Sequence, residues 1–252
     1  MLPFIKLKDW ADASNRPHDD PDFMEYFCHW HNHQDIWTKP LLFLNKNHFT
    51  DHFKTYSEGK ITLHVAETEN VLSALHLLSD NKESLKNPFI LRDAVDLTRT
   101  ALGRFLNFIY IKAFGECDMD KIKVLKDACI KALDVTEKLL SVNPDFSMYE
   151  TLKHLKETAP CNPDFEAVLK RNIYNEYCSQ PAYELMPLFK KEAEIVFDWI
   201  LSGKPDTDFK EKYDAILKGF EETPLAPVPT NYDLSDIIKD SAFIIETIIC
   251  LV

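Results

Sequence analysis

The clearest pattern along this chain of 252 residues is a stripe of apolar positions that follows Asn87-Pro88. Its members are separated alternately by four and three residues: Leu91, Val95, Thr98, Leu102, Phe105 and Ile109. An α-helix completes a turn every 3.6 residues, so this spacing places all of these side chains on one helical face. The stripe therefore predicts a long amphipathic helix with this face in the core.

Three further stretches repeat the same spacing. They run through Ile122, Leu125, Cys129, Ala132, Thr136 and Leu139; through Met186, Phe189, Ala193, Val196 and Ile200; and through Phe209, Tyr213, Ile216 and Phe220. Helices that are joined by short loops pack antiparallel to their neighbours. We therefore predict an all-α fold, an antiparallel helical bundle. Almost all residues from Val71 to Phe220 should lie in helices.

Residues that favour helix ends support these predictions. Asn-Pro pairs occur at Asn87, Asn143 and Asn162. In each pair Asn can cap a helix, while Pro suits the first helical position. Ser147 and Glu150 have the spacing of a capping box, and Asp206 stands where it can cap the last striped helix. With only 5 glycines, the chain favours helices over a glycine-rich barrel or doubly wound sheet.

The stripes divide the chain into four parts. Residues 1–66 form an irregular segment rich in aromatic residues and His, in which Ile61–Val65 alternates like a short strand. Residues 67–222 hold the helical domain. Residues 223–235 form a Pro-rich linker, and residues 236–252 form an apolar C-terminal segment.

The C-terminal segment is too short to span a membrane, and Lys239, Asp240 and Glu246 interrupt it. We expect an amphipathic helix that docks on the bundle, with a frayed end as the alternative. The formal net charge of -12 also disfavours binding to nucleic acid or to an anionic membrane, because both reward a basic patch.

The cysteines show no CxxC pair, and a fold of this size needs no disulfide, so we expect free thiols. There is no Asn-x-Ser/Thr sequon, and the opening MLPFIKLKDW has too short an apolar run for a signal peptide. We expect an intracellular protein or one whose first residues are missing from this sequence.

Histidine is the only candidate for metal chemistry. His29, His31 and His33 alternate in the N-terminal segment, with His18 upstream and His48 and His52 four residues apart. Imidazoles at such spacings can bind zinc, but no HExxH or finger pattern accompanies them. A small metal-binding protein or enzyme is therefore the alternative interpretation, and a polar surface without metal or cofactor is the favoured one.

The order of features from Val71 to Phe114 is more specific: an apolar helix, a polar turn, and a long helix that carries Asp-x-x-Asp-Leu-Thr-Arg. It resembles the start of the C-terminal helical domain of the α-N-acetylglucosaminidases, a family of glycoside hydrolases. The likeness covers roughly residues 67–221. The matching positions are Pro88, Phe89, Arg92, Asp93, Asp96, Leu97, Thr98, Arg99, Phe146 and Asn172, and Trp10 and Arg16 resemble the end of the family's barrel.

The resemblance implies a lysosomal or secreted hydrolase of terminal α-linked N-acetylglucosamine, with two catalytic carboxylates on a (β/α)8 barrel. Such a barrel takes about 250 residues, so none fits beside the helices. The family's Trp-Gly loop is also missing between Tyr177 and Tyr183. We expect Asp93 and Asp96 to be structural, and we expect no catalytic residues in this chain. We therefore expect a non-catalytic helical domain that supports a glycosidase barrel or binds another protein.

Overall fold

The computed structural model describes residues 65–158, 165–175, 182–203, 209–229 and 232–249. Over these residues the chain forms helices and no strand, which confirms the predicted all-α fold. The α-helices are α4 (Val65–Asp80), α5 (Pro88–Gly115), α6 (Met119–Leu140), α7 (Met148–Thr158), α8 (Phe165–Asn175), α9 (Met186–Leu201), α10 (Phe209–Glu222) and α11 (Leu234–Ile249). Short 3-10 helices cover η1 (Ser84–Lys86), η2 (Pro144–Phe146) and η3 (Tyr183–Leu185).

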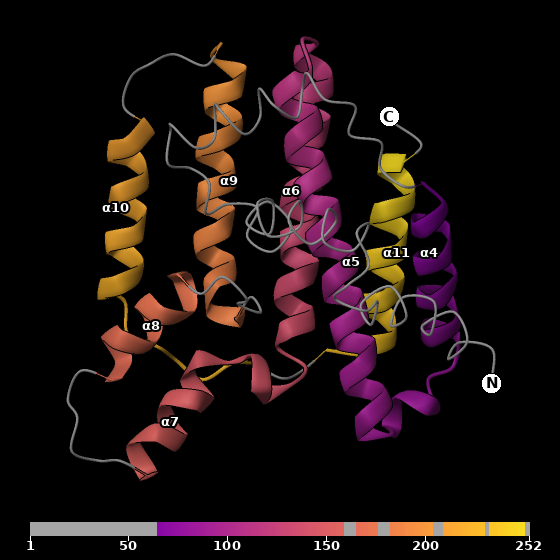
Figure 1. Ribbon diagram of the computed structural model, residues 1–252, viewed down its shortest axis with the longest axis vertical. Coiled ribbons are helices and arrows are strands. Elements are labelled where there is room, and N and C mark those ends of the chain that lie inside the picture. Colours follow the sequence, from indigo (N-terminus) through magenta and orange to yellow (C-terminus); the bar gives the residue numbers. More distant parts are fainter. Residues whose placement is uncertain (1–64, 159–164, 176–181, 204–208, 230–231, 250–252) are drawn as a thin grey trace, which may run out of the picture.

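Five helices form a row in the order α4, α11, α6, α9 and α10, and each packs against the next (Figure 1). Neighbours in this row run in opposite directions, although only α9 and α10 follow one another directly in the chain. Helix α5 packs against α6 and also contacts α11 and α4, while α7 and α8 lie across the lower end of the row. The row differs from chain order at one place, because α11 lies between α4 and α6.

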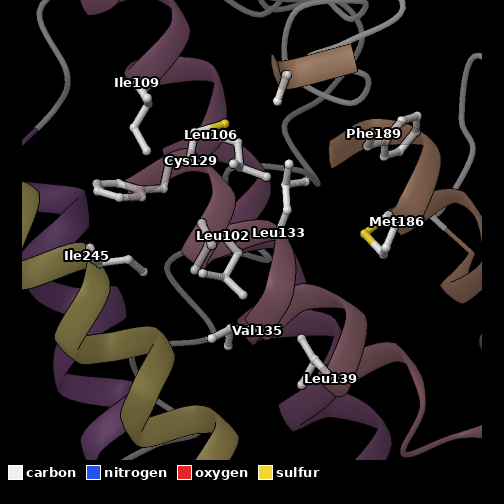
Figure 2. Close-up of a cluster of buried hydrophobic side chains, with 14 of the residues drawn as sticks. Leu102, Leu106, Ile109, Cys129, Leu133, Val135, Leu139, Met186, Phe189 and Ile245 are labelled. Atoms are coloured by element: carbon white, nitrogen blue, oxygen red, sulfur yellow. The ribbon is translucent and has the colours of Figure 1, made fainter. Parts of the chain in front are cut away.

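Helix α5 begins and packs as its sequence predicts. The Asn87 side chain accepts a hydrogen bond from the Phe89 backbone N–H at 3.0 Å, and Pro88 occupies the first turn. Of the predicted stripe, Leu91 is half-buried and the other members are buried. All members of the α6 stripe are buried too. Figure 2 shows part of this shared core, with Leu102, Leu106, Ile109, Cys129, Leu133, Val135, Leu139, Met186, Phe189 and Ile245.

Helix α9 joins this core through its predicted stripe, and ion pairs hold it to α6. Lys190 of α9 pairs with Asp134 and Glu137 of α6. Lys126 of α6 pairs with Asp198 of α9 at 2.6 Å. The α10 stripe packs less deeply: Tyr213, Ile216 and Phe220 are half-buried against the core. The predicted cap Asp206 lies outside the described residues.

Helix α7 shows half of its predicted capping box. Ser147 Oγ accepts from the Glu150 backbone N–H at 3.2 Å, as expected. The Glu150 carboxylate pairs with Lys153 at 3.5 Å. Glu184 of η3 provides the remaining acceptors: its two oxygens accept from the N–H groups of Met148 and Tyr149, each at 2.9 Å. A residue more than 30 positions away therefore completes the cap, which local sequence spacing could not reveal.

The two expected end segments differ in detail from the structure. Helix α4 begins at Val65, so the strand expected over Ile61–Val65 is wrong at its last residue, and residues 61–64 lie outside the described part. Helix α11 begins at Leu234, two residues inside the expected linker, because the Asp233 side chain accepts from the Ser235 backbone N–H at 2.8 Å and caps the helix there. No helix in the described part of the chain is both long enough and apolar enough to cross a membrane.

Candidate functional site

Three of the family-matching residues meet at one place, which we call the arginine–phenylalanine cluster: Asp96, Arg99 and Phe146. Arg99 donates from Nη2 to Asp96 Oδ1 at 3.0 Å, one helical turn away on α5. The Arg99 guanidinium carbon lies 5.4 Å from the centre of the Phe146 ring, within the range of a cation–π contact. The cluster therefore links α5 to the residues just before α7.

Local sequence explains how Phe146 reaches α5. Asn143 ends the turn after α6, and its side chain accepts from the Asp145 backbone N–H at 3.0 Å. The resulting 3-10 helix η2 buries Phe146. Burial lowers the pKa of Arg99, whereas the adjacent Asp96 carboxylate opposes that change. The guanidinium thus pairs with Asp96 and lies in cation–π contact with Phe146, an arrangement that holds two elements together.

Exposed family-matching residues lie in the first two turns of α5. Phe89 has 80% of its surface exposed. Arg92 and Asp93 are also exposed, and Arg92 approaches Asp145 of η2 only to 4.0 Å. Pro88 starts the helix. These side chains line the end of α5 without entering the core.

Two further family-matching residues, Leu97 and Thr98, take ordinary helical roles. Thr98 is buried and donates to the Ala94 carbonyl at 2.7 Å, so its hydroxyl is satisfied within α5. Leu97 is half-buried against the core. Asn172 lies on α8, and its side chain is outside the described part, as are Trp10 and Arg16. Asp96 is engaged by Arg99, whereas Asp93 is exposed to solvent.

Asp96→Asn is expected to lower the free energy of unfolding by about 1 kcal/mol, because it weakens a charge-assisted hydrogen bond to a mostly buried Arg99. Urea denaturation would measure the change. Asp93→Asn, on the same helix but exposed, is the matched control and should leave stability unchanged. An Asp96 variant with unaltered stability that lost a binding property would instead assign this carboxylate a functional role.

A second polar group, absent from the sequence predictions, lies in the bundle core: Tyr110 of α5, Cys129 of α6 and Glu192 of α9. The Cys129 thiol donates to the Tyr110 hydroxyl at 3.3 Å, and the Tyr110 ring lies 5.6 Å from that of Phe197. All three polar residues are buried. Cys129 belongs to the predicted stripe, but no sequence signal pairs it with Tyr110, because the pair joins two helices.

Burial disfavours the charged forms of the ionisable groups in this core. It raises the pKa of the Cys129 thiol to about 12 and the pKa of Tyr110 well above its ordinary value. It also raises the pKa of the Glu192 carboxyl well above the usual range. A neutral thiol is a poor nucleophile, so these groups contribute polar packing to the core. Of the other cysteines only Cys117 lies in the described part, and its thiol is free and exposed.

Glu192→Gln should remove a pH-dependent loss of stability. This carboxyl has a higher pKa in the folded chain than in the unfolded chain, so the fold favours its protonated form. The resulting stabilisation is fully present below about pH 4.3, the pKa in the unfolded chain, and is lost as pH rises towards the pKa in the folded chain. The advantage of the Gln variant in urea denaturation should therefore grow from acidic to neutral pH, by up to about 1.4 kcal/mol per pH unit. Parallel pH profiles for the two proteins would contradict the buried, raised-pKa carboxyl.

Lys170 of α8 is the buried cation of the described chain, and it holds the start of the linker. Its ammonium group donates to the carbonyls of Glu221 and Thr223 and pairs with Glu166 at 3.2 Å. Glu166 also accepts from the Leu225 N–H at 2.8 Å. These contacts match the three N–H bonds of an ammonium group. Lys170 therefore caps the end of α10 and positions the linker.

Within the described residues, no three His, Cys, Asp or Glu side chains are placed to bind a metal ion. The six histidines singled out in the sequence lie outside this part: His18, His29, His31, His33, His48 and His52. The metal hypothesis for the N-terminal segment thus stays a prediction.

Comparison with known proteins adds no relative: no family model, curated protein or solved structure matches this chain. The resemblance to the α-N-acetylglucosaminidases therefore rests on its residues alone.

Proposed function

We propose that this chain is a non-catalytic helical domain that binds another protein, in the manner of the helical domain that accompanies the barrel of an α-N-acetylglucosaminidase. The arginine–phenylalanine cluster carries this proposal. Three residues of the family-like pattern, Asp96, Arg99 and Phe146, contact one another and join α5 to η2. Their contacts suit a structural role in a helical domain better than a role in hydrolysis.

The carboxyl groups of the described chain argue against hydrolysis. A retaining glycosidase needs one protonated and one ionised carboxyl about 5 Å apart, facing the sugar. Among the described residues, Glu192 has the strongly raised carboxyl pKa expected of a general acid. However, Glu192 is fully buried between helices, where no sugar can reach it. The requirement for an accessible acid is therefore unmet in this part of the chain.

The start of α5 is the surface that we assign to the partner. It presents Phe89, Arg92 and Asp93 within two helical turns, all exposed. Aromatic residues and Arg are enriched at protein interfaces and often supply most of the binding energy. We expect this surface to contact the partner protein, for which a glycosidase barrel is the first candidate.

Two measurements test the proposal. The purified chain should release no aryl group from an aryl N-acetyl-α-glucosaminide, and a rate abolished by changing one Asp or Glu would contradict this. The chain should also bind a separately produced α-N-acetylglucosaminidase barrel in calorimetry. Phe89→Ala should weaken that binding by at least about tenfold, whereas Val124→Ala, an exposed apolar residue on α6, should not. Equal affinity for both variants would remove the start of α5 from the interface.

A further inference from the structure

The linker after α10 opens with a segment in which prolines restrain the backbone. Residues 224–229 read Pro-Leu-Ala-Pro-Val-Pro and form no regular secondary structure. Proline fixes its own φ at about −65° and pushes the residue before it into extended conformations. The three prolines therefore restrain every residue from 223 to 229 except Leu225. Such a sequence favours the polyproline II helix, which has three residues per turn.

Burial along this segment repeats every three residues. Leu225 and Val228 are half-buried, and Leu225 packs against the core. The other residues of the segment are exposed: Pro224, Ala226, Pro227 and Pro229. A polyproline II helix has three edges, each made of residues three apart, so this pattern indicates that one edge lies on the bundle and two edges face solvent. We call the four exposed residues the proline ridge.

Helix α8 fixes the start of the proline ridge, which runs past this helix (Figure 1). The Lys170 ammonium group donates to the carbonyls of Glu221 and Thr223. The Glu166 carboxylate accepts from the Leu225 backbone N–H at 2.8 Å. Leu225, which the prolines leave unrestrained, is therefore held by a hydrogen bond to the bundle.

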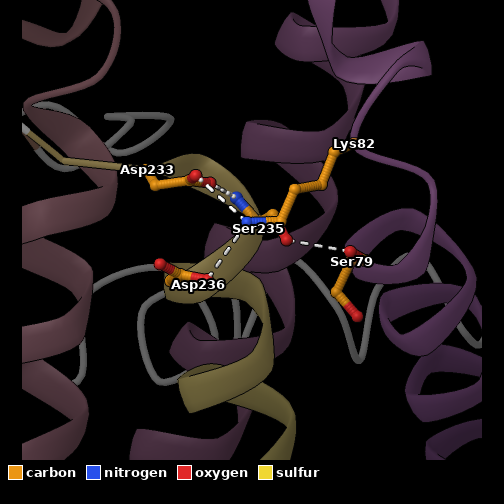
Figure 3. Close-up of polar contacts among 5 residues, drawn as sticks. All are labelled: Ser79, Lys82, Asp233, Ser235 and Asp236. Carbon is orange, nitrogen blue, oxygen red and sulfur yellow. Dashed lines mark hydrogen bonds and ion pairs between the residues drawn. The ribbon is translucent and has the colours of Figure 1, made fainter.

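The chain is fixed again at the start of α11 (Figure 3). The Asp233 side chain accepts from the Ser235 backbone N–H at 2.8 Å and pairs with Lys82 at 3.2 Å. The Ser235 hydroxyl donates to the Ser79 carbonyl of α4 at 2.8 Å. The proline ridge thus lies between two anchored points, and a segment held in this way loses little conformational entropy when a partner binds it.

The spacing of the exposed prolines fits one mode of peptide recognition. Pro224 and Pro227 form a Pro-x-x-Pro pattern on one edge of the ridge. Protein domains that recognise proline, among them SH3 domains, bind such polyproline II segments in grooves lined by aromatic side chains. A groove contacts two of the three edges, and here the two solvent-facing edges are available while the third rests on the bundle.

The charges beside the ridge restrict the kind of groove that can bind it. Glu221 and Glu222 are exposed in the last turn of α10, directly before the ridge. The formal net charge of the whole chain is -12. Like charges that face each other across an interface oppose binding, whereas opposite charges favour it. The groove that fits this ridge therefore has basic side chains along its rim.

We propose that the proline ridge is a binding site for a second protein, a proline-recognition domain whose aromatic groove has a basic rim. Pro224 and Pro227 enter the groove, Ala226 and Pro229 form the second contacting edge, and the carboxylate of Glu221 meets the rim. This inference does not rest on the proposed partner surface at the start of α5, because it uses no residue of that surface.

Two forms of one SH3 domain, each titrated into the full chain, test the proposal. In the first form the acidic residues along the rim of the groove are replaced by Lys, and the second form is the unaltered domain. We expect calorimetry to show that the Lys form binds, and that it binds more tightly than the unaltered form. No binding of the Lys form, or tighter binding of the unaltered form, would overturn the proposal.

Substitutions in the chain locate the binding site. Pro227→Ala should weaken binding of the Lys form by at least about tenfold, because it removes one of the two prolines that enter the groove. Pro187→Ala makes the same change at an exposed proline in the first turn of α9 and is the matched control, which should bind as the original chain does. Equal affinity of the two variants would overturn the proposal.

A charge reversal provides a test that leaves every proline in place. Glu221→Lys combined with Glu222→Lys should reverse the preference between the two forms of the SH3 domain, since the flank of the ridge is then basic. Both side chains are exposed, so the melting temperature should stay close to that of the original chain. An unchanged preference for the Lys form would overturn the proposal.

Discussion

Leu102→Asp is expected to unfold the chain or to lower its free energy of unfolding by at least about 4 kcal/mol, against a typical total of 5–15 kcal/mol. Leu102 is 0% exposed and lies in the centre of the α5 stripe. A carboxylate there would lose its hydration, and the apolar neighbours offer it no partner (Figure 2). Circular dichroism during heating and urea denaturation would measure the effect.

The matched control is Leu77→Asp on α4, where the leucine is 47% exposed. The same change at that position keeps the charge in contact with water and should cost less than about 1 kcal/mol. Similar melting temperatures for the two variants would mean that Leu102 does not face the core, and the assignment of the stripe would then be wrong.

The second large effect is expected at the other end of the chain. Ile238 of α11 is 0% exposed and faces the core that α4, α5 and α6 share. Ile238→Asp should destabilise the protein by at least about 4 kcal/mol, for the same reason as Leu102→Asp. The prediction tests whether the fold depends on α11. If α11 were only a tail attached to a bundle that is stable without it, its loss would leave the melting of the remaining bundle unchanged.

Phe243→Asp is the control on the same helix. Phe243 is 68% exposed, so the charged variant should melt close to the original chain and should gain solubility. Equal destabilisation by both substitutions would indicate that α11 does not bury the face described here. An unchanged melting curve for Ile238→Asp would show that the bundle folds without α11.

The helices themselves were predictable because their signals are local. A helix places residues three and four apart on one face, so the stripes through Leu102 and Cys129 identify buried faces without any knowledge of the fold. Helix ends are equally local: Asn87 caps α5 through an N–H only two residues away. The same geometry allows the ion pair between Asp96 and Arg99, which lie one turn apart, but the sequence left open whether each would pair with the other or with a neighbouring helix.

The contacts between elements were not predictable from these patterns. Apolar spacing identifies which face of α11 is buried, but the place of α11 between α4 and α6 depends on a choice among several apolar surfaces. The cap that Glu184 provides for α7 and the bond from Cys129 to Tyr110 join residues that are far apart in sequence or on different helices.

This chain's sequence by itself determined its helical class, most helix positions, the striped core faces and the Asn caps. The tertiary structure alone decided the order of the helices in the row, the burial of Glu192 and Lys170, and the path of the linker. The physical reason is that helix periodicity and capping depend on residues within one or two turns, whereas packing order minimises a free energy that is summed over the whole chain. Many pairings of apolar faces bury similar areas, so a single helix does not encode which pairing has the lowest free energy.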